Sequence, residues 1–120
     1  MNTPTTNRFF RFTTSNQVYL KRLLINEITI TSEFPYILYQ IPFELTTTPS
    51  KVWKQILLDI WQSKIQHKGS VSESVMWVFH NRILIDNVPI ELVEDKLETL
   101  VISTIEETNK QMSRSEQRFI

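Results

Sequence analysis

The chain has 120 residues and no cysteine, and its 13 basic and 13 acidic side chains give a formal net charge of zero at pH 7. A chain of this length builds one domain around one core, and a hydrophobic content of 41% argues against global disorder. The zero net charge argues against a nucleic-acid protein that binds through bulk positive charge, and the lack of cysteine excludes disulfides, thiolate nucleophiles and Cys-ligated zinc.

Residue types exclude several further classes of site. Gly69 is the only glycine, so the chain has no glycine-rich loop for a phosphate or a dinucleotide. His67 and His80 are the only histidines, and neither has the sequence neighbours of a metal site or of a strong nucleophile. We therefore expect no enzymatic activity, no metal and no cofactor.

The sequence also carries a prediction about location. No apolar run reaches the roughly 20 residues that a membrane-spanning helix needs. Residues 1–8 are polar and lack the apolar core of a signal peptide. Secreted domains of this size often rely on disulfides, which this chain cannot form. We expect an intracellular protein, cytoplasmic or nuclear, without membrane contact.

Residues 1–17 are predicted to form a flexible arm, residues 18–107 a single α+β domain, and residues 108–120 a polar tail. The arm interleaves arginines with three aromatic residues, Phe9, Phe10 and Phe12. Such a pattern can stack on single-stranded nucleic acid, but the zero net charge argues against that role. We favour a partner-binding arm, because so much aromatic surface is expected to pack on this chain or on another.

From Asn26 onward, apolar and polar residues alternate with the period of half-buried strands. Ile28 and Ile30 alternate with threonines, and a second strand follows over Tyr36–Leu45, with one apolar and one polar face. Pro42 cannot donate a backbone hydrogen bond, so we expect this second strand to lie near a sheet edge at that point.

A helix over about residues 49–66 is the most strongly periodic element. Thr48 followed by Pro49 is typical of a helix start, a hydroxyl N-cap and then a proline in the first turn. Gly69 is the expected helix stop. The apolar stripe repeats at helical spacing and consists of Val52, Trp53, Ile56, Leu57, Ile60, Trp61 and Ile65.

The run Val75–Phe79 is apolar on both faces and predicts a central strand, which a short strand over Ile83–Ile85 follows. Residues 90–109 allow two interpretations. The β-branched run Thr99–Ile105 favours a strand, whereas the spacing of the apolar residues also fits a helix. We take the strand as the first interpretation and keep the helix as the alternative.

This order of elements resembles a ubiquitin-like β-grasp domain over about residues 26–106. The resemblance rests on the run Val78–Ile90, in which a strand ends in Phe79 and a turn, a basic residue and a second turn follow. It also rests on Leu100-Val101-Ile102, which stand where such domains enter their last strand. The fold that the resemblance implies is a mixed sheet packed on one main helix. The alternative is another two-layer α+β fold with a second helix at residues 90–109.

The chain departs from the ubiquitin-like pattern at two kinds of position. Asn81 and Asn87 stand where the family commonly has glycine, and Asn tolerates the positive φ of such turns. The printed sequence ends in Arg118-Phe119-Ile120 rather than in Gly-Gly. The resemblance therefore implies a ubiquitin-like domain of the non-conjugated type, which acts by binding other proteins.

The resemblance also suggests a binding surface. Val78 and Val101 would lie on the exposed sheet face beside Arg82, with Phe9, Phe10 and Phe12 as a second contact surface. We expect a non-catalytic protein–protein interaction module, a subunit or adaptor of an intracellular complex. The alternatives are a self-assembling structural or regulatory α+β protein, which makes a homo-oligomer possible, and a small nucleic-acid-binding protein.

Overall fold

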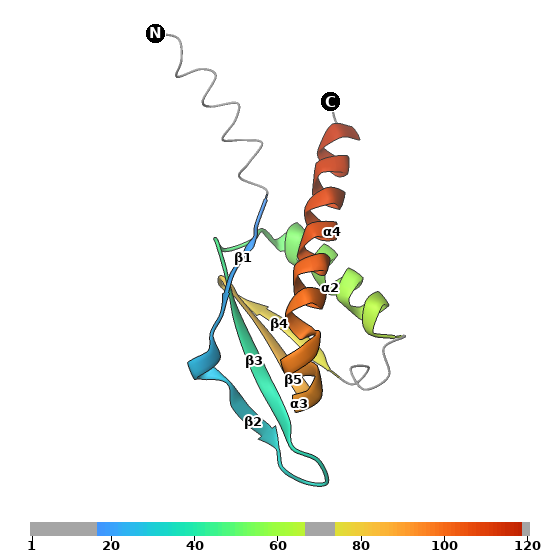
Figure 1. Cartoon of the computed structure of the whole chain (residues 1–120). Helices are drawn as coiled ribbons and strands as arrows, with labels where there is room; N and C mark the ends of the chain where they lie inside the picture. The colour runs from blue at the N-terminus through green and yellow to red at the C-terminus, as the bar shows by residue number, and fades with distance from the viewer. Residues whose placement is uncertain (1–16, 67–73, 119–120) are drawn as a thin grey trace.

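A computed structural model describes residues 17–66 and 74–118, and it shows an α+β architecture in which helices pack on an antiparallel sheet (Figure 1). The elements in chain order are β1 (Leu20–Leu23), the 3-10 helix η1 (Ile25–Glu27), β2 (Thr29–Ser32), β3 (Leu38–Leu45), α2 (Lys51–Ile65), β4 (Val75–Phe79), β5 (Arg82–Pro89), α3 (Ile90–Asp95) and α4 (Leu97–Arg118).

The sheet has the order β1-β3-β5-β4, and β2 also pairs with β3. β1 pairs with the Phe43–Leu45 end of β3, and β2 pairs with the Leu38–Gln40 end. Because β5 occupies the other side of β3, β1 and β2 together form one edge strand that η1 interrupts. Every described strand pair is antiparallel, so the predicted mixed sheet is wrong.

Pro42 lies in an interior strand, which corrects the predicted position near a sheet edge. Its carbonyl oxygen accepts a hydrogen bond from the Leu24 N–H at 2.9 Å. The N–H and C=O of one strand residue point to the same side, so the nitrogen of Pro42 points at the gap between β1 and β2. The interruption of the edge strand thus lies where β3 has no N–H to offer, and β3 stays central.

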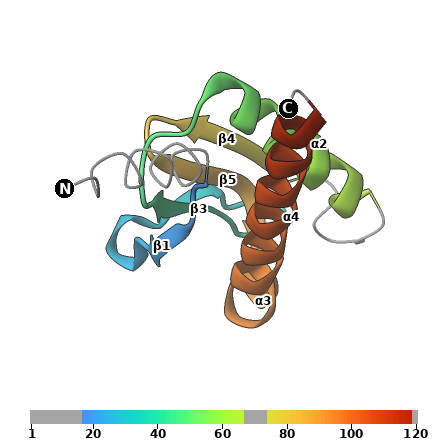
Figure 2. The same ribbon diagram turned by 90° about the horizontal axis from the view of Figure 1, so that it is seen from above.

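The core lies between one face of the sheet and the two long helices. The face of β3 and β5 that looks toward the helices is largely buried, and α2 and α4 add a buried stripe each. Seen from above in Figure 2, α4 lies along one side of the sheet with α2 beside it. The largest buried side chains are Trp53, Trp61, Phe43, Ile41, Leu45, Leu57, Ile65, Ile83, Ile85, Leu97, Ile105 and Val88.

Helix α2 matches the predicted helix with small differences at its start. Ser50 is the N-cap, and its side-chain oxygen accepts the Trp53 N–H at 3.1 Å. Thr48 therefore does not cap the helix, and Pro49 precedes the cap instead of following it. Val52 was expected in the apolar stripe but is 60% exposed. The predicted stop at Gly69 lies outside the described residues.

The predicted strand over Thr99–Ile105 is wrong, because these residues belong to α4. Leu97, Val101 and Ile105 follow one another at helical spacing and are all buried against the core. That burial outweighs the modest helix penalty of β-branched residues. The helical alternative for residues 90–109 is confirmed in outline, with a short α3 before α4. The last strand of a ubiquitin-like sheet has no counterpart here, and the β-grasp fold is not confirmed.

Helix α4 continues to Arg118, well past the predicted domain boundary at residue 107. Thr108, Asn109 and Met112 are buried, so this part of the expected tail belongs to the core. The buried threonine hydroxyl donates to the Thr104 carbonyl at 2.8 Å, which satisfies it within the helix.

The side-chain amide of Asn109 joins three parts of the molecule. Its Oδ1 accepts hydrogen bonds from the Val18 N–H at 3.2 Å and from the Trp53 indole N–H at 2.9 Å. Its Nδ2 donates to the Val18 carbonyl at 2.9 Å. Asn109 thereby fastens the segment leading into β1 and the first turn of α2 to helix α4. Val18 and Asn109 are 91 positions apart in the sequence.

We predict that Asn109→Ala destabilises the fold by about 3 kcal/mol, because buried N–H and C=O groups of Val18 and Trp53 lose their partners. The measurement is urea unfolding followed by circular dichroism. Lys110→Ala, at the neighbouring exposed position, is the matched control and should change the free energy of unfolding by less than about 0.5 kcal/mol. Equal effects of the two substitutions would show that the amide does not hold these segments together.

Candidate functional site

The predicted surface of Val78, Arg82 and Val101 does not exist as one exposed face. Val101 is fully buried on α4 and belongs to the core, because residues 97–118 form a helix instead of a strand and tail. Val78 is half-buried and packs against the core. It lies on the same side of β4 as the buried Met76, so its side chain faces the helix layer and not the open sheet face.

Arg82 is exposed as expected, but its guanidinium is already paired. Its Nη1 lies 2.6 Å from Oε1 of Glu27, which η1 carries. The predicted second contact surface, Phe9, Phe10 and Phe12, lies outside the described residues.

The structure instead exposes large apolar side chains on the sheet face that the helices leave uncovered. Side chains alternate along β4, and Val75, Trp77 and Phe79 point away from the core with exposed fractions of 43%, 55% and 62%. Leu84 lies directly opposite Trp77 on β5, is half-buried and completes the group. We call these four residues, Val75, Trp77, Phe79 and Leu84, the outer patch.

Asp86 orients the tryptophan of the outer patch. The Trp77 indole N–H donates to Oδ2 of Asp86 at 2.9 Å, and the Gln40 side-chain amide donates to Oδ1 at 2.6 Å. Both carboxylate oxygens are therefore engaged, and the indole is held by its polar edge while much of its ring stays exposed. A shallow hollow of about 310 Å³ lies here, lined by Gln40, Trp77, Val78, Phe79, Leu84 and Asp86.

Charged residues border the outer patch on the side of β3 and β1. Glu44 is the β3 residue opposite Arg82, and its Oε1 forms an ion pair with Nε of Arg22 at 2.7 Å. Arg82 itself pairs with Glu27. These ion pairs lie at the surface, with Glu44 partly buried, and contribute little stability, but they balance the charge around the apolar residues. The sheet face that carries the outer patch thus has paired charges toward β1 and apolar side chains on β4.

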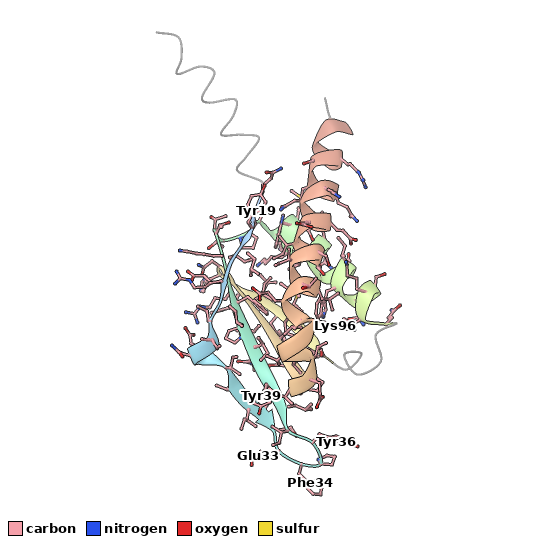
Figure 3. The ribbon with its side chains drawn as sticks, viewed as in Figure 1. Tyr19, Glu33, Phe34, Tyr36, Tyr39 and Lys96 are labelled. Carbon is pink, nitrogen blue, oxygen red and sulfur yellow. The ribbon has the colours of Figure 1, made fainter. Side chains whose placement is uncertain are left out.

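A second exposed apolar group lies at the tip of the loop between β2 and β3. Phe34 and Tyr36 are 89% and 73% exposed, and Figure 3 shows both at the end of this loop, away from the helices. The register separates this tip from much of the outer patch: the loop adjoins the Leu38 end of β3, whereas Phe79 lies in the row of Glu44 at the other end. The two groups can therefore be tested separately.

His80 and Asp86 each contact an aromatic residue of the outer patch. His80 packs its ring against Phe79, with centroids 4.3 Å apart, and Asp86 is occupied by Gln40 and Trp77. Residues 17–66 and 74–118 hold no group of three side chains suited to a metal ion. Within those ranges no helix has the length and apolar character to cross a bilayer.

Comparison with protein-family models, with curated proteins and with solved structures finds no match to this chain. The candidate site therefore rests on the geometry of the chain itself.

The sequence interpretation missed the outer patch because it assigned Val75–Phe79 to a central strand. A run that is apolar on both faces looks the same whether its second face is covered by the chain itself or by another molecule. The signal that could have found the patch is the alternation along β4, which places Trp77 and Phe79 on one face and Met76 on the other, helix-covered face.

We predict that Val101→Ala destabilises the protein by about 2 kcal/mol, because it removes two fully buried methyl groups and leaves a cavity between α4 and the sheet. Ile102→Ala is the control on the same helix, at a side chain that is 39% exposed, and it should cost well under half as much. Thermal unfolding of both variants measures the difference. A larger effect at Ile102 would mean that the assigned buried face of α4 is wrong.

Proposed function

We propose that this chain is a non-catalytic protein–protein interaction module, a subunit or adaptor of an intracellular complex, that docks a protein partner on the outer patch. The observation that carries the proposal is the exposure of Val75, Trp77 and Phe79 on one face of the sheet. Exposed apolar groups that gather on one surface and are bordered by polar residues are typical of protein interaction sites.

The composition of the surface fits a protein partner. Trp and other aromatic residues are enriched at the centre of interfaces, and charged pairs are typical of the rim. Trp77 and Phe79 supply the aromatic centre here, while Arg82 and Glu44 belong to the rim. The hydrogen bond from Trp77 to Asp86 fixes the indole before binding. The side chain therefore loses less conformational entropy when a partner docks.

The ubiquitin-like resemblance adds only an analogy. Such domains often bind partners through apolar residues on the exposed sheet face, and the outer patch occupies an exposed sheet face here. The replacement of the expected last strand by α4 weighs against a β-grasp domain. The proposal therefore depends on the exposed side chains and not on the family.

Charge does not favour nucleic acid on this face. Arg82 is paired to Glu27, Arg22 is paired to Glu44, and Asp86 stands beside the exposed tryptophan. A surface that stacks bases needs unpaired positive charge for the phosphates. A protein partner accounts for the same aromatic residues without that requirement.

We predict that the double substitution Trp77→Ser plus Phe79→Ser abolishes capture of a stoichiometric partner when the tagged full-length chain is purified from its native cells. Removing two aromatic anchors should weaken binding at least about tenfold. Quantitative mass spectrometry of the co-purified proteins gives the ratio to the unsubstituted chain. Circular dichroism and the melting temperature confirm that the double variant stays folded.

The matched control is Phe34→Ser plus Tyr36→Ser, which removes two aromatics from the loop tip that are even more exposed than Trp77 and Phe79. This variant should keep the partner. If the control loses the partner and the outer-patch variant keeps it, the docking surface is the loop tip and the proposal is wrong. If neither variant changes a captured partner, both surfaces are excluded.

A further inference from the structure

Strand β4 has the composition of a central strand but the position of an edge strand. In the described part of the chain, β4 pairs with β5 alone, and none of the backbone hydrogen bonds outside the regular elements involves it. Residues 75–79 contain no charge, no proline and no glycine, and the ladder to β5 runs without a register shift. Edge strands normally carry at least one such feature, because an unprotected edge pairs with other chains.

The opposite edge of the sheet shows the expected protection. Lys21 and Arg22 in β1 are exposed, and η1 interrupts the edge between β1 and β2. The ladders of β1 and β2 with β3 each contain a register shift. One edge of this sheet is therefore blocked against pairing, whereas no residue of ranges 17–66 and 74–118 pairs with the outer side of β4.

The hairpin register tells which backbone groups of β4 face the open edge. Phe79 and Arg82 flank the two-residue turn His80-Asn81, and such a flanking pair exchanges backbone hydrogen bonds. Because hydrogen-bonded pairs alternate along an antiparallel ladder, Trp77 and Val75 also bond toward β5. The N–H and C=O groups of Met76 and Val78 then point outward at the free edge.

We propose that two copies of this chain pair through β4, antiparallel and about a two-fold axis at Trp77. Met76 of each copy exchanges backbone hydrogen bonds with the partner's Val78, and Trp77 lies opposite the partner's Trp77. The two sheets become one continuous sheet, and the two outer patches join. The inference deepens the proposed function, on which it rests, by naming a second copy as the occupant of the edge beside the outer patch.

The register about Trp77 satisfies the outward backbone groups of β4 and also pairs compatible side chains across the two strands. It places a non-hydrogen-bonded pair at the centre, where side chains of opposed strands lie closest, and it puts the two indoles there. On the same face Val75 lies opposite the partner's Phe79, an aromatic and β-branched pair that stabilises antiparallel strands. On the inner face Met76 meets the partner's Val78, so no charge is opposed anywhere along the strand.

A second copy fits this edge better than an unrelated strand. In a two-fold antiparallel pair, each strand lies opposite a copy of itself that runs in the other direction. With the axis at Trp77, every residue of the segment 75–79 then lies opposite an apolar residue. The shared segment is short, so the interface lies at the small end of protein interfaces, and we expect a dimer that dissociates on dilution.

Cysteine cross-linking tests the register directly, because the natural chain contains no cysteine. Only position 77 lies opposite itself in the proposed pair. Trp77→Cys in the full chain should form a disulfide-linked dimer under mild oxidation at least about tenfold faster than Val75→Cys or Phe79→Cys alone, since only closely opposed side chains satisfy disulfide geometry. An equimolar mixture of the Val75→Cys and Phe79→Cys chains should cross-link to each other.

Equal cross-linking at all three positions, or cross-linking no faster than for Ile102→Cys on α4, would overturn the proposal. The Ile102→Cys chain reports random collision, because its side chain is exposed on the other layer of the molecule.

A second measurement acts on the backbone and leaves the outer patch in place. Light scattering after size exclusion should give the unsubstituted chain at high concentration a mass near twice 14.3 kDa. Val78→Pro removes the outward N–H and should return the mass to that of one chain. Val78→Ala keeps the N–H and should remain dimeric. Circular dichroism checks that the proline variant is folded, and the cysteine series decides the question if it is not.

The same two sets of variants separate this inference from the proposed function. A monomeric unsubstituted chain whose partner capture still depends on Trp77 and Phe79 would refute the dimer and leave the proposed function standing. A dimer that follows the register, with no partner that depends on the outer patch, would refute the proposed function and leave the dimer standing.

Discussion

The buried amide of Asn109 is the contact on which the arrangement of the layers depends. It satisfies both backbone groups of Val18 and the indole N–H of Trp53. A buried polar group without partners costs free energy, so these hydrogen bonds favour the observed arrangement of the three elements. The segment entering β1, helix α2 and helix α4 are thereby held on one side of the sheet. The sequence does not reveal this role of Asn109, because residues 108–118 are mostly polar or charged and the asparagine does not stand out among them.

The outer patch follows from this arrangement. With α2 and α4 packed on the same face, the structure shows no helix over the other face of β3, β5 and β4 in its described part. On that face an ion pair joins Glu44 of β3 to Arg22 of β1, and another joins Arg82 of β5 to Glu27 of η1. The β4 side has no such residues, so Trp77 and Phe79 are exposed there. The uncovered face thus carries paired charges toward β1 and exposed apolar side chains on β4, the edge strand that no other described strand besides β5 adjoins.

Local periodicity was enough to predict α2 and the alternation of β3, because each has one apolar face that packs on the core and one more polar face. It was not enough for α4. Val101, Thr104 and Ile105 have β-branched side chains that favour strands, and only their burial against a core assembled from distant residues makes the helix preferable. The error carried into the site: Val101 was placed on a sheet that does not contain it. Arg82 was placed on the surface correctly, but its ion pair with Glu27 depends on η1, which no local signal indicated.

The prediction for β4 failed in a different and more informative way. The strand forms where the sequence placed it, and only its position in the sheet differs. A strand's composition reflects the surroundings in which the strand is stable, and residues 75–79 have the composition of a strand with neighbours on both sides. β1 and β2 show what an edge in this same sheet looks like when it is meant to stay free, with Lys21, Arg22 and an interruption. Both edges belong to one sheet of one chain, so the overall composition of the protein does not explain the contrast. The contrast therefore supports the proposed pairing of β4 over a general tolerance of exposed apolar residues.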